Sequence, residues 1–315
     1  MHAMAEPPLI RAQRLSRRYG EHLAVQDLSF ELQRGEVLGF LGLNGAGKST
    51  SLNLLSGNLR PDSGQVWIAG HDLARAPRAA RARLGYLPEH PPLLRDLRVD
   101  EYLRYAARLH GVARARLTMA VDEAKTRCGL EAVGRQLIGT LSKGYQQRLG
   151  IAQAIVHQPD VVLLDEPTVG LDPAQIRDIR GLIRELGHDH AVMLSSHILP
   201  EVEALCSRVL ILHRGRIVFS ETMDSLSGDR DTLQVTFARP PTLDQLAVLD
   251  GIVTVEALDG GRFRLRQNRP VADALTRAAV ERDWGLTELT PLQRGLEQTF
   301  VELTCADEPH KEAAG

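Results

Sequence analysis

The chain of 315 residues is poor in lysine, aromatic residues and cysteine, and it contains no long hydrophobic run. Only four lysines stand among its 38 basic residues, so arginine supplies nearly all of the positive charge. The 38 basic and 40 acidic residues almost cancel, which argues against binding to nucleic acid or to an anionic membrane surface through overall charge. Any charged partner must be recognised locally, and we expect no nucleic-acid partner.

The scarcity of cysteine and of apolar runs narrows the setting further. Cys128, Cys206 and Cys305 are odd in number and share no metal-ligand spacing, which argues against a disulfide framework and fits a reducing compartment. The apolar runs VLGFLGL and VVLLD have the length of strands, far short of the roughly 20 residues that cross a bilayer. The N-terminal segment lacks the apolar core of a signal peptide. We expect a soluble, cytoplasmic protein.

Two regions differ in their pattern. From about residue 8 to 220, short apolar runs alternate with helical stretches, which predicts an α/β layer structure with buried strands. From 221 to 304, LQVTF and RFRLR alternate apolar with polar residues, and helical stretches lie near 242–249 and 271–282. This order predicts a small α+β domain of ferredoxin-like type. Residues 305–315 are predicted to be a disordered tail.

The first chemical motif is GLNGAGKST, which satisfies the pattern G-x-x-x-x-G-K-[ST] between a strand-like and a helix-like segment. Glycines let successive backbone N–H groups turn toward a phosphate, and a helix N-terminus adds partial positive charge. Lys48 would reach the β and γ phosphates, and Ser49 would ligate Mg²⁺. A plain glycine-rich turn is the weaker alternative in this context. The predicted ATP-binding residues here are Gly42, Leu43, Asn44, Gly45, Ala46, Gly47, Lys48, Ser49 and Thr50.

The second motif, VVLLDEPT, ends a predicted buried strand with two adjacent carboxylates. Ligands of open α/β sheets bind at this end of the strands. Asp165 suits Mg²⁺, and Glu166 suits the orientation or deprotonation of an attacking water. Solvated carboxylates often end strands, so the phosphate loop upstream is what makes this pair significant.

A third stretch, LSKGYQQRLG, predicts a turn followed by a polar helix start suited to an anion. Together the three stretches resemble the nucleotide-binding subunits of ABC transporters along about 210 residues. GLNGAGKST resembles their Walker A loop, VVLLDEP their Walker B strand, and LSKGYQQR the signature sequence particular to this family. The resemblance implies a P-loop ATPase core with an α-helical subdomain at about 90–155.

The same resemblance assigns further roles. Tyr19 is placed like the aromatic residue that stacks on adenine, ahead of the first strands, although an isolated tyrosine is more often simply half-buried. His197 is similar to the switch histidine that contacts the γ-phosphate, although an isolated histidine is more often a surface or capping group. Asp172 lies in a D-loop-like segment, and Asp before Pro173 also suits a helix N-cap.

Three positions depart from the common family pattern. Glu89 stands in GYLPEH where many members have glutamine, and an ionised glutamate accepts hydrogen bonds but cannot donate them. We expect Glu89 to approach Mg²⁺ while altering how the site couples to its partner. Lys143 and Tyr145 replace a glycine and a glutamine of the signature, which leaves Ser142 and Gly144 in place. Similar variants are familiar among ATPases of the ABC-2 export type. The segment GLEQTFVELT likewise resembles the segment that closes such subunits.

The resemblance implies ATP and Mg²⁺ as cofactors and a head-to-tail pair of ATPase subunits, either two identical copies or a copy with a similar subunit. Each ATP would lie between the Walker motifs of one copy and the signature of the other, with Glu166 and His197 catalytic. Membrane permease subunits would hold the pair at the inner face of the cell membrane and would export cargo that this chain does not touch. One alternative is a soluble ABC-type ATPase of DNA repair or of ribosomes, and another is a regulatory protein that binds ATP without turnover.

Overall fold

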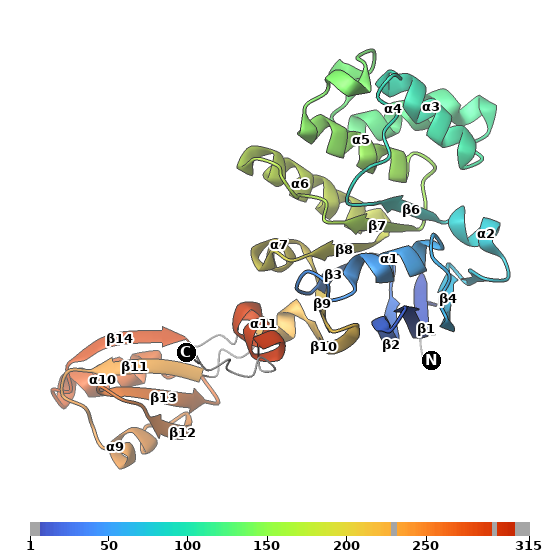
Figure 1. Ribbon diagram of the computed structural model, residues 1–315. Coiled ribbons are helices and arrows are strands. Elements are labelled where there is room, and N and C mark those ends of the chain that lie inside the picture. Colours follow the sequence, from blue (N-terminus) through green and yellow to red (C-terminus); the bar gives the residue numbers. More distant parts are fainter. Residues whose placement is uncertain (1–6, 228–231, 292–294, 306–315) are drawn as a thin grey trace, which may run out of the picture. The chain divides into compact units, whose positions relative to one another are not determined.

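The computed structural model describes residues 7–227, 232–291 and 295–305, and Figure 1 shows their helices and strands. The chain divides into two compact units, Met1–Glu221 with Leu303–Gly315, and Thr222–Glu302. Each unit is described by itself. Most of the predicted disordered tail lies outside the described residues, and Cys305 belongs to a helix rather than to a tail.

The first unit contains a four-stranded sheet with the order β2-β1-β4-β5. Its strands are β1 (Ile10–Tyr19), β2 (His22–Leu32), β4 (Ser63–Ile68) and β5 (His71–Asp72). Tyr19, predicted to lie ahead of the first strands, is instead the last residue of β1 and pairs with His22. Register shifts interrupt β1, and Arg14 has a positive φ of 47°. These irregularities break the alternation by which a strand is recognised in sequence.

A six-stranded sheet forms the centre of the first unit, with the order β10-β9-β3-β8-β7-β6. Its strands are β3 (Val37–Leu41), β6 (Leu84–Leu87), β7 (Val161–Asp165), β8 (Ala191–Ser196), β9 (Arg208–His213) and β10 (Arg216–Thr222). Strands β6, β7, β8, β3 and β9 run parallel to one another. Parallel strands of this kind bring their carboxyl ends to one edge of the sheet, where ligands bind in such folds.

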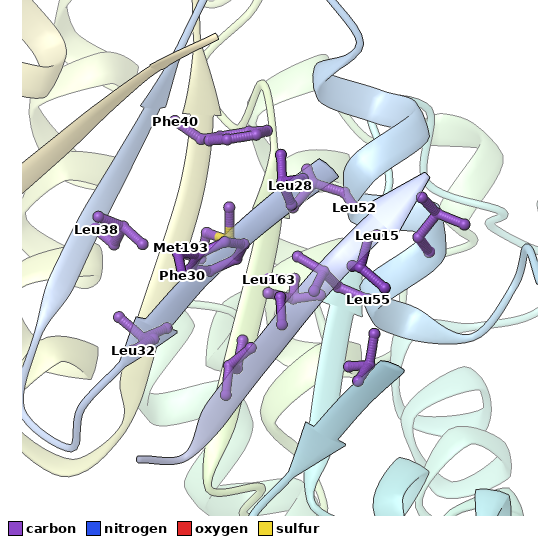
Figure 2. Packing of buried hydrophobic residues seen from close by; sticks show 14 of the residues in the cluster. Leu15, Leu28, Phe30, Leu32, Leu38, Phe40, Leu52, Leu55, Leu163 and Met193 are labelled. Carbon is purple, nitrogen blue, oxygen red and sulfur yellow. The ribbon is translucent and has the colours of Figure 1, made fainter. Parts of the chain in front are cut away.

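A hydrophobic core lies between the two sheets of this unit and helix α1 (Lys48–Ser56). Figure 2 shows its packing, with Leu15 and Leu28 from the first sheet, Leu52 and Leu55 from α1, and Phe40, Leu163 and Met193 from the second sheet. The labelled side chains on β3, β7 and β8 alternate with residues that point to the opposite face. Ala80 of α2 (Pro77–Arg81) also belongs to this core, whereas α6 (Pro173–Asp189) and α7 (Leu199–Leu205) supply none of its residues.

Between β6 and β7 the chain forms a helical subdomain, as the resemblance implied for residues 90–155. It contains α3 (Val99–Leu109), α4 (Leu117–Cys128) and α5 (Lys143–Ile155), with short 3-10 turns η1 (Arg114–Arg116), η2 (Glu131–Val133) and η3 (Ile138–Thr140). Helix α5 packs close to β6 because Gly85 has no side chain. A Cβ at Gly85 would stand 2.1 Å from the Ala154 carbonyl oxygen.

The second unit has the β-α-β-β-α-β order predicted from the sequence. Its elements are β11 (Thr232–Phe237), α9 (Leu243–Ala247), β12 (Ile252–Ala257), β13 (Arg262–Gln267), α10 (Ala272–Glu281) and β14 (Leu286–Pro291). Helix α8 (Met223–Ser227) precedes them, and α11 (Leu296–Cys305) follows across the boundary between the units. The antiparallel sheet order β12-β13-β11-β14 confirms the ferredoxin-like fold.

The core of the second unit forms on one face of its sheet. Leu233, Val235 and Phe237 of β11 and Phe263 and Leu265 of β13 pack with residues of α9 and α10. The alternating residues of β13 on the other face are exposed arginines. No helix in the described parts of the chain is long and apolar enough to cross a membrane.

Candidate nucleotide site

Three strands of the central sheet place the predicted motifs at one edge. Leu41, the last residue of β3, is in register with Ser196 of β8, and Asp165 of β7 is in register with Ser195. The loop after β3, the carboxylates at the end of β7 and the histidine after β8 therefore start from the same level of the sheet. Segments that are more than 100 residues apart in sequence meet there.

The phosphate-loop motif forms a tight loop between β3 and α1, as its pattern predicts. Gly45 and Gly47 have positive φ angles of 81° and 106°, a region that glycine enters without steric cost. A Cβ at Gly47 would lie 2.3 Å from the Ala24 carbonyl oxygen, so only glycine fits against β2. The loop ends at Lys48, where α1 begins and its free backbone N–H groups face the loop.

Lys48 is the cation at the centre of this edge, and it is 7% exposed. Its Nζ donates a hydrogen bond to the Gly42 carbonyl oxygen at 2.7 Å and lies 3.6 Å from Oε1 of Glu166. Since water screens a buried pair only weakly, the attraction between these two charges is stronger than it would be at the surface. The lysine thus compensates a carboxylate that is itself only 7% exposed.

Asp165 is fixed by hydroxyl groups from two other elements. Its Oδ1 accepts hydrogen bonds from Ser195 Oγ at 2.6 Å and from Ser49 Oγ at 3.4 Å. Burial raises the pKa of the Asp165 carboxyl, the two hydroxyl hydrogen bonds act in the opposite direction, and the nearby carboxylates Glu166 and Glu89 raise it further. This cluster of negative charge favours a cation beside it.

Glu166 and His197 are in direct contact. The Nδ1 atom of His197 lies 3.0 Å from each carboxylate oxygen of Glu166. Glu166 has a positive φ of 48°, which is costly for a residue with a side chain, and its N–H donates to Ser195 Oγ at 3.0 Å. A strained residue held in this way, beside a histidine, has the geometry of a general base with an orienting partner.

A cavity of about 630 Å³ opens in front of these residues. Its lining includes the predicted Tyr19, Leu43, Asn44, Gly45, Gly47, Lys48, Ser49, Thr50, Glu89, Glu166 and His197. Gly42, Ala46 and Asp165 are buried and are not among the lining residues. Sequence reasoning missed His22, Ala24 and Val169, which also line the cavity. His22 and Ala24 come from the start of β2, and only the pairing of β2 with β1 brings them there, so no motif marks them.

The signature residues Ser142, Lys143, Gly144 and Tyr145 do not line this cavity. Ser142 is the N-cap of α5, and its Oγ accepts from the Tyr145 N–H at 3.4 Å. A Cβ added at Gly144 would lie 2.6 Å from the Gln175 side chain, and one at Gly170 would lie 1.9 Å from Lys143 Nζ. The start of α5 therefore packs on the D-loop segment and the start of α6.

Asp172 takes the capping role that its position before a proline predicts. Its carboxylate accepts hydrogen bonds from the N–H groups of Ala174 and Gln175 at 3.0 and 2.9 Å. This N-cap fixes the start of α6.

Comparisons with known proteins agree with this geometry. The family model described as "ABC transporter" matches residues 25–169. The chain is 32% identical to the bacitracin transport ATP-binding protein BcrA of Bacillus licheniformis, over 94% of this chain and 97% of that protein. It is 33% identical to the daunorubicin resistance ATP-binding protein DrrA3 of Streptomyces coeruleorubidus, over 95% of this chain and 96% of that protein.

A solved structure titled "Structure of ATP binding subunit of ABC transporter" has 32% identity and a TM-score of 0.64, covering 76% of this chain and 98% of its own. None of these proteins is a repair or ribosomal ATPase. From the fold, the site and these relatives together, the chain belongs to the ABC transporter family, as an ATP-binding subunit whose ATP hydrolysis is coupled to transport.

Proposed function

We propose that two ATPase subunits close head to tail around two ATP molecules, and that this chain forms such a pair with a second copy of itself or with a similar subunit. The observation that carries the proposal is the separation of two sets of residues within one chain. Lys48, Glu166 and His197 converge on the cavity, whereas Ser142 and its neighbours on α5 lie outside it. A second copy would supply the signature to complete each site.

The residues of the cavity have distinct tasks in hydrolysis. Lys48 and the N–H groups at the start of α1 bind the β and γ phosphates and compensate the charge that develops on them. Glu166 accepts a proton from the attacking water, and His197, 3.0 Å away, orients the carboxylate and faces the γ-phosphate. Closure of the second copy over the cavity excludes water other than the nucleophile.

The donor set at this edge suits Mg²⁺, which prefers hard oxygen ligands. Ser49 Oγ lies 3.4 Å from Asp165 Oδ1, and Glu89 lines the same cavity. Bound Mg²⁺ would neutralise phosphate charge. The hydroxyl of Ser49 and the carboxylate of Asp165 would hold it, with Glu89 nearby as an acceptor-only group where a glutamine could also donate.

Tyr19 is the proposed platform for adenine. Its side chain is 48% exposed at the cavity, and the Arg17 guanidinium lies 5.2 Å from the ring centroid. The flat face of an aromatic ring can stack on a nucleotide base. The neighbouring Arg17 guanidinium limits the orientation of the Tyr19 ring. Stacking orients the nucleotide so that its phosphates reach Lys48.

We further infer that the partners in the membrane are permease subunits and that transport is outward, from the cytoplasmic face. The names of the relatives support this direction, because one is a bacitracin transport protein and another a daunorubicin resistance protein.

The test is steady-state ATP hydrolysis by Glu166→Gln, which keeps the shape of the side chain and removes the base. We expect turnover to fall by about 100-fold or more while ATP binding is retained, and we expect ATP to stabilise a dimer of this variant in size-exclusion chromatography. Glu203→Gln is the matched control, because Glu203 is exposed on α7. Rapid turnover by Glu166→Gln would exclude Glu166 as the base.

A further inference from the structure

Glu201 is a buried carboxylate whose hydrogen-bond partners are neighbours in sequence of Glu166 and His197, and no motif of the sequence marks it. It lies in the first turn of α7 and is 2% exposed. A buried carboxylate loses its hydration, so it persists only where polar groups compensate its charge. The identity of those groups indicates what Glu201 does.

Two hydroxyl groups converge on a single oxygen of Glu201. Thr168 Oγ1 donates to Oε2 at 2.5 Å, and Ser196 Oγ lies 3.4 Å from the same atom. Both hydroxyl-bearing residues are buried. Short hydrogen bonds to an ionised group are stronger than neutral ones, so the Thr168 contact is a firm attachment point.

The other oxygen of Glu201 is less well compensated. Oε1 lies 3.7 Å from Nη2 of Arg180 on α6, and within the described parts of the chain it accepts no hydrogen bond. A carboxylate placed only to stabilise α7 would bond the free N–H groups of its own helix. Its strongest contact is instead to a residue 33 positions earlier.

The two hydroxyl groups belong to the segments that carry the catalytic pair. Thr168 follows Glu166 by two residues, and Ser196 immediately precedes His197. Glu201 therefore holds a side chain in each of the two segments whose Glu166 carboxylate and His197 ring meet at 3.0 Å. Because Glu166 has a strained positive φ of 48°, its conformation needs support from both sides. Ser195 supports it through the Glu166 N–H, and the Thr168 attachment supports the chain just after it.

We propose that Glu201 is a positioning residue for ATP hydrolysis, which sets the distance and orientation between Glu166 and His197 by holding Thr168 and Ser196 on one carboxylate oxygen. Glu201 does not line the cavity. The inference rests on the proposed function, because it assumes that Glu166 and His197 act on the attacking water. Misplacement of a reacting group by about 1 Å can cost roughly 100-fold in rate, so loss of this attachment acts on turnover rather than on binding.

The experiment compares Glu201→Met, which cannot accept either hydrogen bond, with Glu201→Gln, which keeps one acceptor oxygen and the same length. In the full chain we expect Glu201→Met to lower kcat by about 10- to 100-fold, with the KM for ATP and the affinity for ATP changed by less than about twofold. Glu201→Gln should recover most of kcat. The exposed Glu203→Gln on the same helix should match the wild type in every measurement.

Thr168→Val and Ser196→Ala test the same attachment without changing the carboxylate, and they serve if Glu201→Met does not fold. Each should lower kcat alone, and where Glu201→Met folds, Thr168→Val combined with it should lower kcat by less than the product of the single effects, because the two residues share one contact. Unchanged kcat in a folded Glu201→Met, or in both hydroxyl variants, would overturn the proposal. An equal loss of ATP affinity and kcat would do so too. If wild-type chain fails to hydrolyse ATP, or Glu166→Gln stays active, the proposed function itself fails.

Discussion

At the scale of single residues, the site is a balance of buried charges. Lys48 and Glu166 are both 7% exposed and lie 3.6 Å apart. Asp165, which accepts hydrogen bonds from Ser49 and Ser195, and the exposed Glu89 add negative charge. Removing one partner of a buried pair leaves the other charge uncompensated, which costs more than the pair itself contributes. Substitutions here therefore affect binding, catalysis and stability together.

The Lys48→Ala variant separates phosphate binding from the rest of the site. We expect it to weaken ATP binding by about 100-fold or more, because the phosphates lose their main cation. It should also lower the unfolding free energy by about 1 to 3 kcal/mol, because Glu166 is left buried without its ammonium partner. Isothermal titration with ATP and urea unfolding measure the two effects, and Arg104→Ala, at an exposed position of α3 outside the cavity, is the control for nucleotide affinity. Unaltered ATP affinity in Lys48→Ala would contradict the assignment of the phosphate loop.

Motif spacing was enough to predict the residues that combine a fixed sequence with a fixed backbone shape. Gly45 and Gly47 of the phosphate loop and Glu166 at the end of β7 carry a local signal, His197 was assigned through the family resemblance, and the structure brings these residues to one cavity. His22, Ala24 and Glu201 carry none. Their positions depend on the pairing of β2 with β1 and on a contact between α7 and Thr168, and such tertiary contacts leave no periodicity in the sequence.

At the scale of elements, helix α5 has a polar start that the sequence shows and a packing role that the sequence does not show. Its polar N-terminus was predicted as an anion site, and its glycines were explained by the family signature. The structure adds that Gly144 and Lys143 pack on Gln175 and Gly170, so the signature and the D-loop of one chain are in contact. In contrast, β1 was not predicted as a strand through Tyr19, because register shifts and a positive φ at Arg14 interrupt its alternation.

Ser142→Arg tests whether the start of α5 acts on a nucleotide held by another copy. Ser142 is exposed and outside the cavity, so we expect ATP affinity to change by less than about threefold while hydrolysis stops, because the bulky side chain blocks close approach of a second subunit. Ser142→Ala is the control for the lost N-cap, which is worth about 1 kcal/mol. ATP titration and phosphate release distinguish the outcomes. Hydrolysis at the wild-type rate by Ser142→Arg would mean that the signature does not face a phosphate.

At the scale of the whole molecule, the two units have separate cores, and the sequence indicates the task of the first unit but not that of the second. The core of the first unit draws on residues between Ile10 and Leu212, and that of the second on residues between Leu233 and Trp284. The fold of the second unit could be predicted because period-two alternation and two helical stretches occur in a distinctive order. Its task could not, because no phosphate loop, metal spacing or nucleophile arrangement accompanies that order. All residues proposed to act on ATP lie in the first unit.

The pH dependence of stability follows from a histidine at the opposite end of the sheet from the nucleotide site. His157 lies between α5 and β7, with Nε2 at 3.1 Å from the Leu84 carbonyl oxygen and its ring stacked 3.8 Å from that of His110. The carbonyl accepts, so Nε2 carries the hydrogen and buried Nδ1 is left without one. Burial first, and then the charge of His110, lower the pKa of His157 to about 3 against the opposing effect of the hydrogen bond to Leu84, and burial also lowers the pKa of His110.

These lowered pKa values make the first unit less stable in acid. The folded pKa of His157 lies below the unfolded value of about 6.5, so the unfolded chain binds more protons than the folded chain between pH 6.5 and 3. The unfolding free energy therefore decreases as the pH is lowered through that window. At pH 5 the loss due to His157 alone is about 2 kcal/mol. His157→Gln keeps a donor for Leu84 and does not titrate, so its unfolding free energy should fall by about 2 kcal/mol less than that of the wild type between pH 7.5 and pH 5. Urea unfolding at both pH values measures this difference, and the exposed His188→Gln should retain the full wild-type loss. Equal losses in wild type and His157→Gln would show that the buried imidazole is not the group that couples protonation to unfolding.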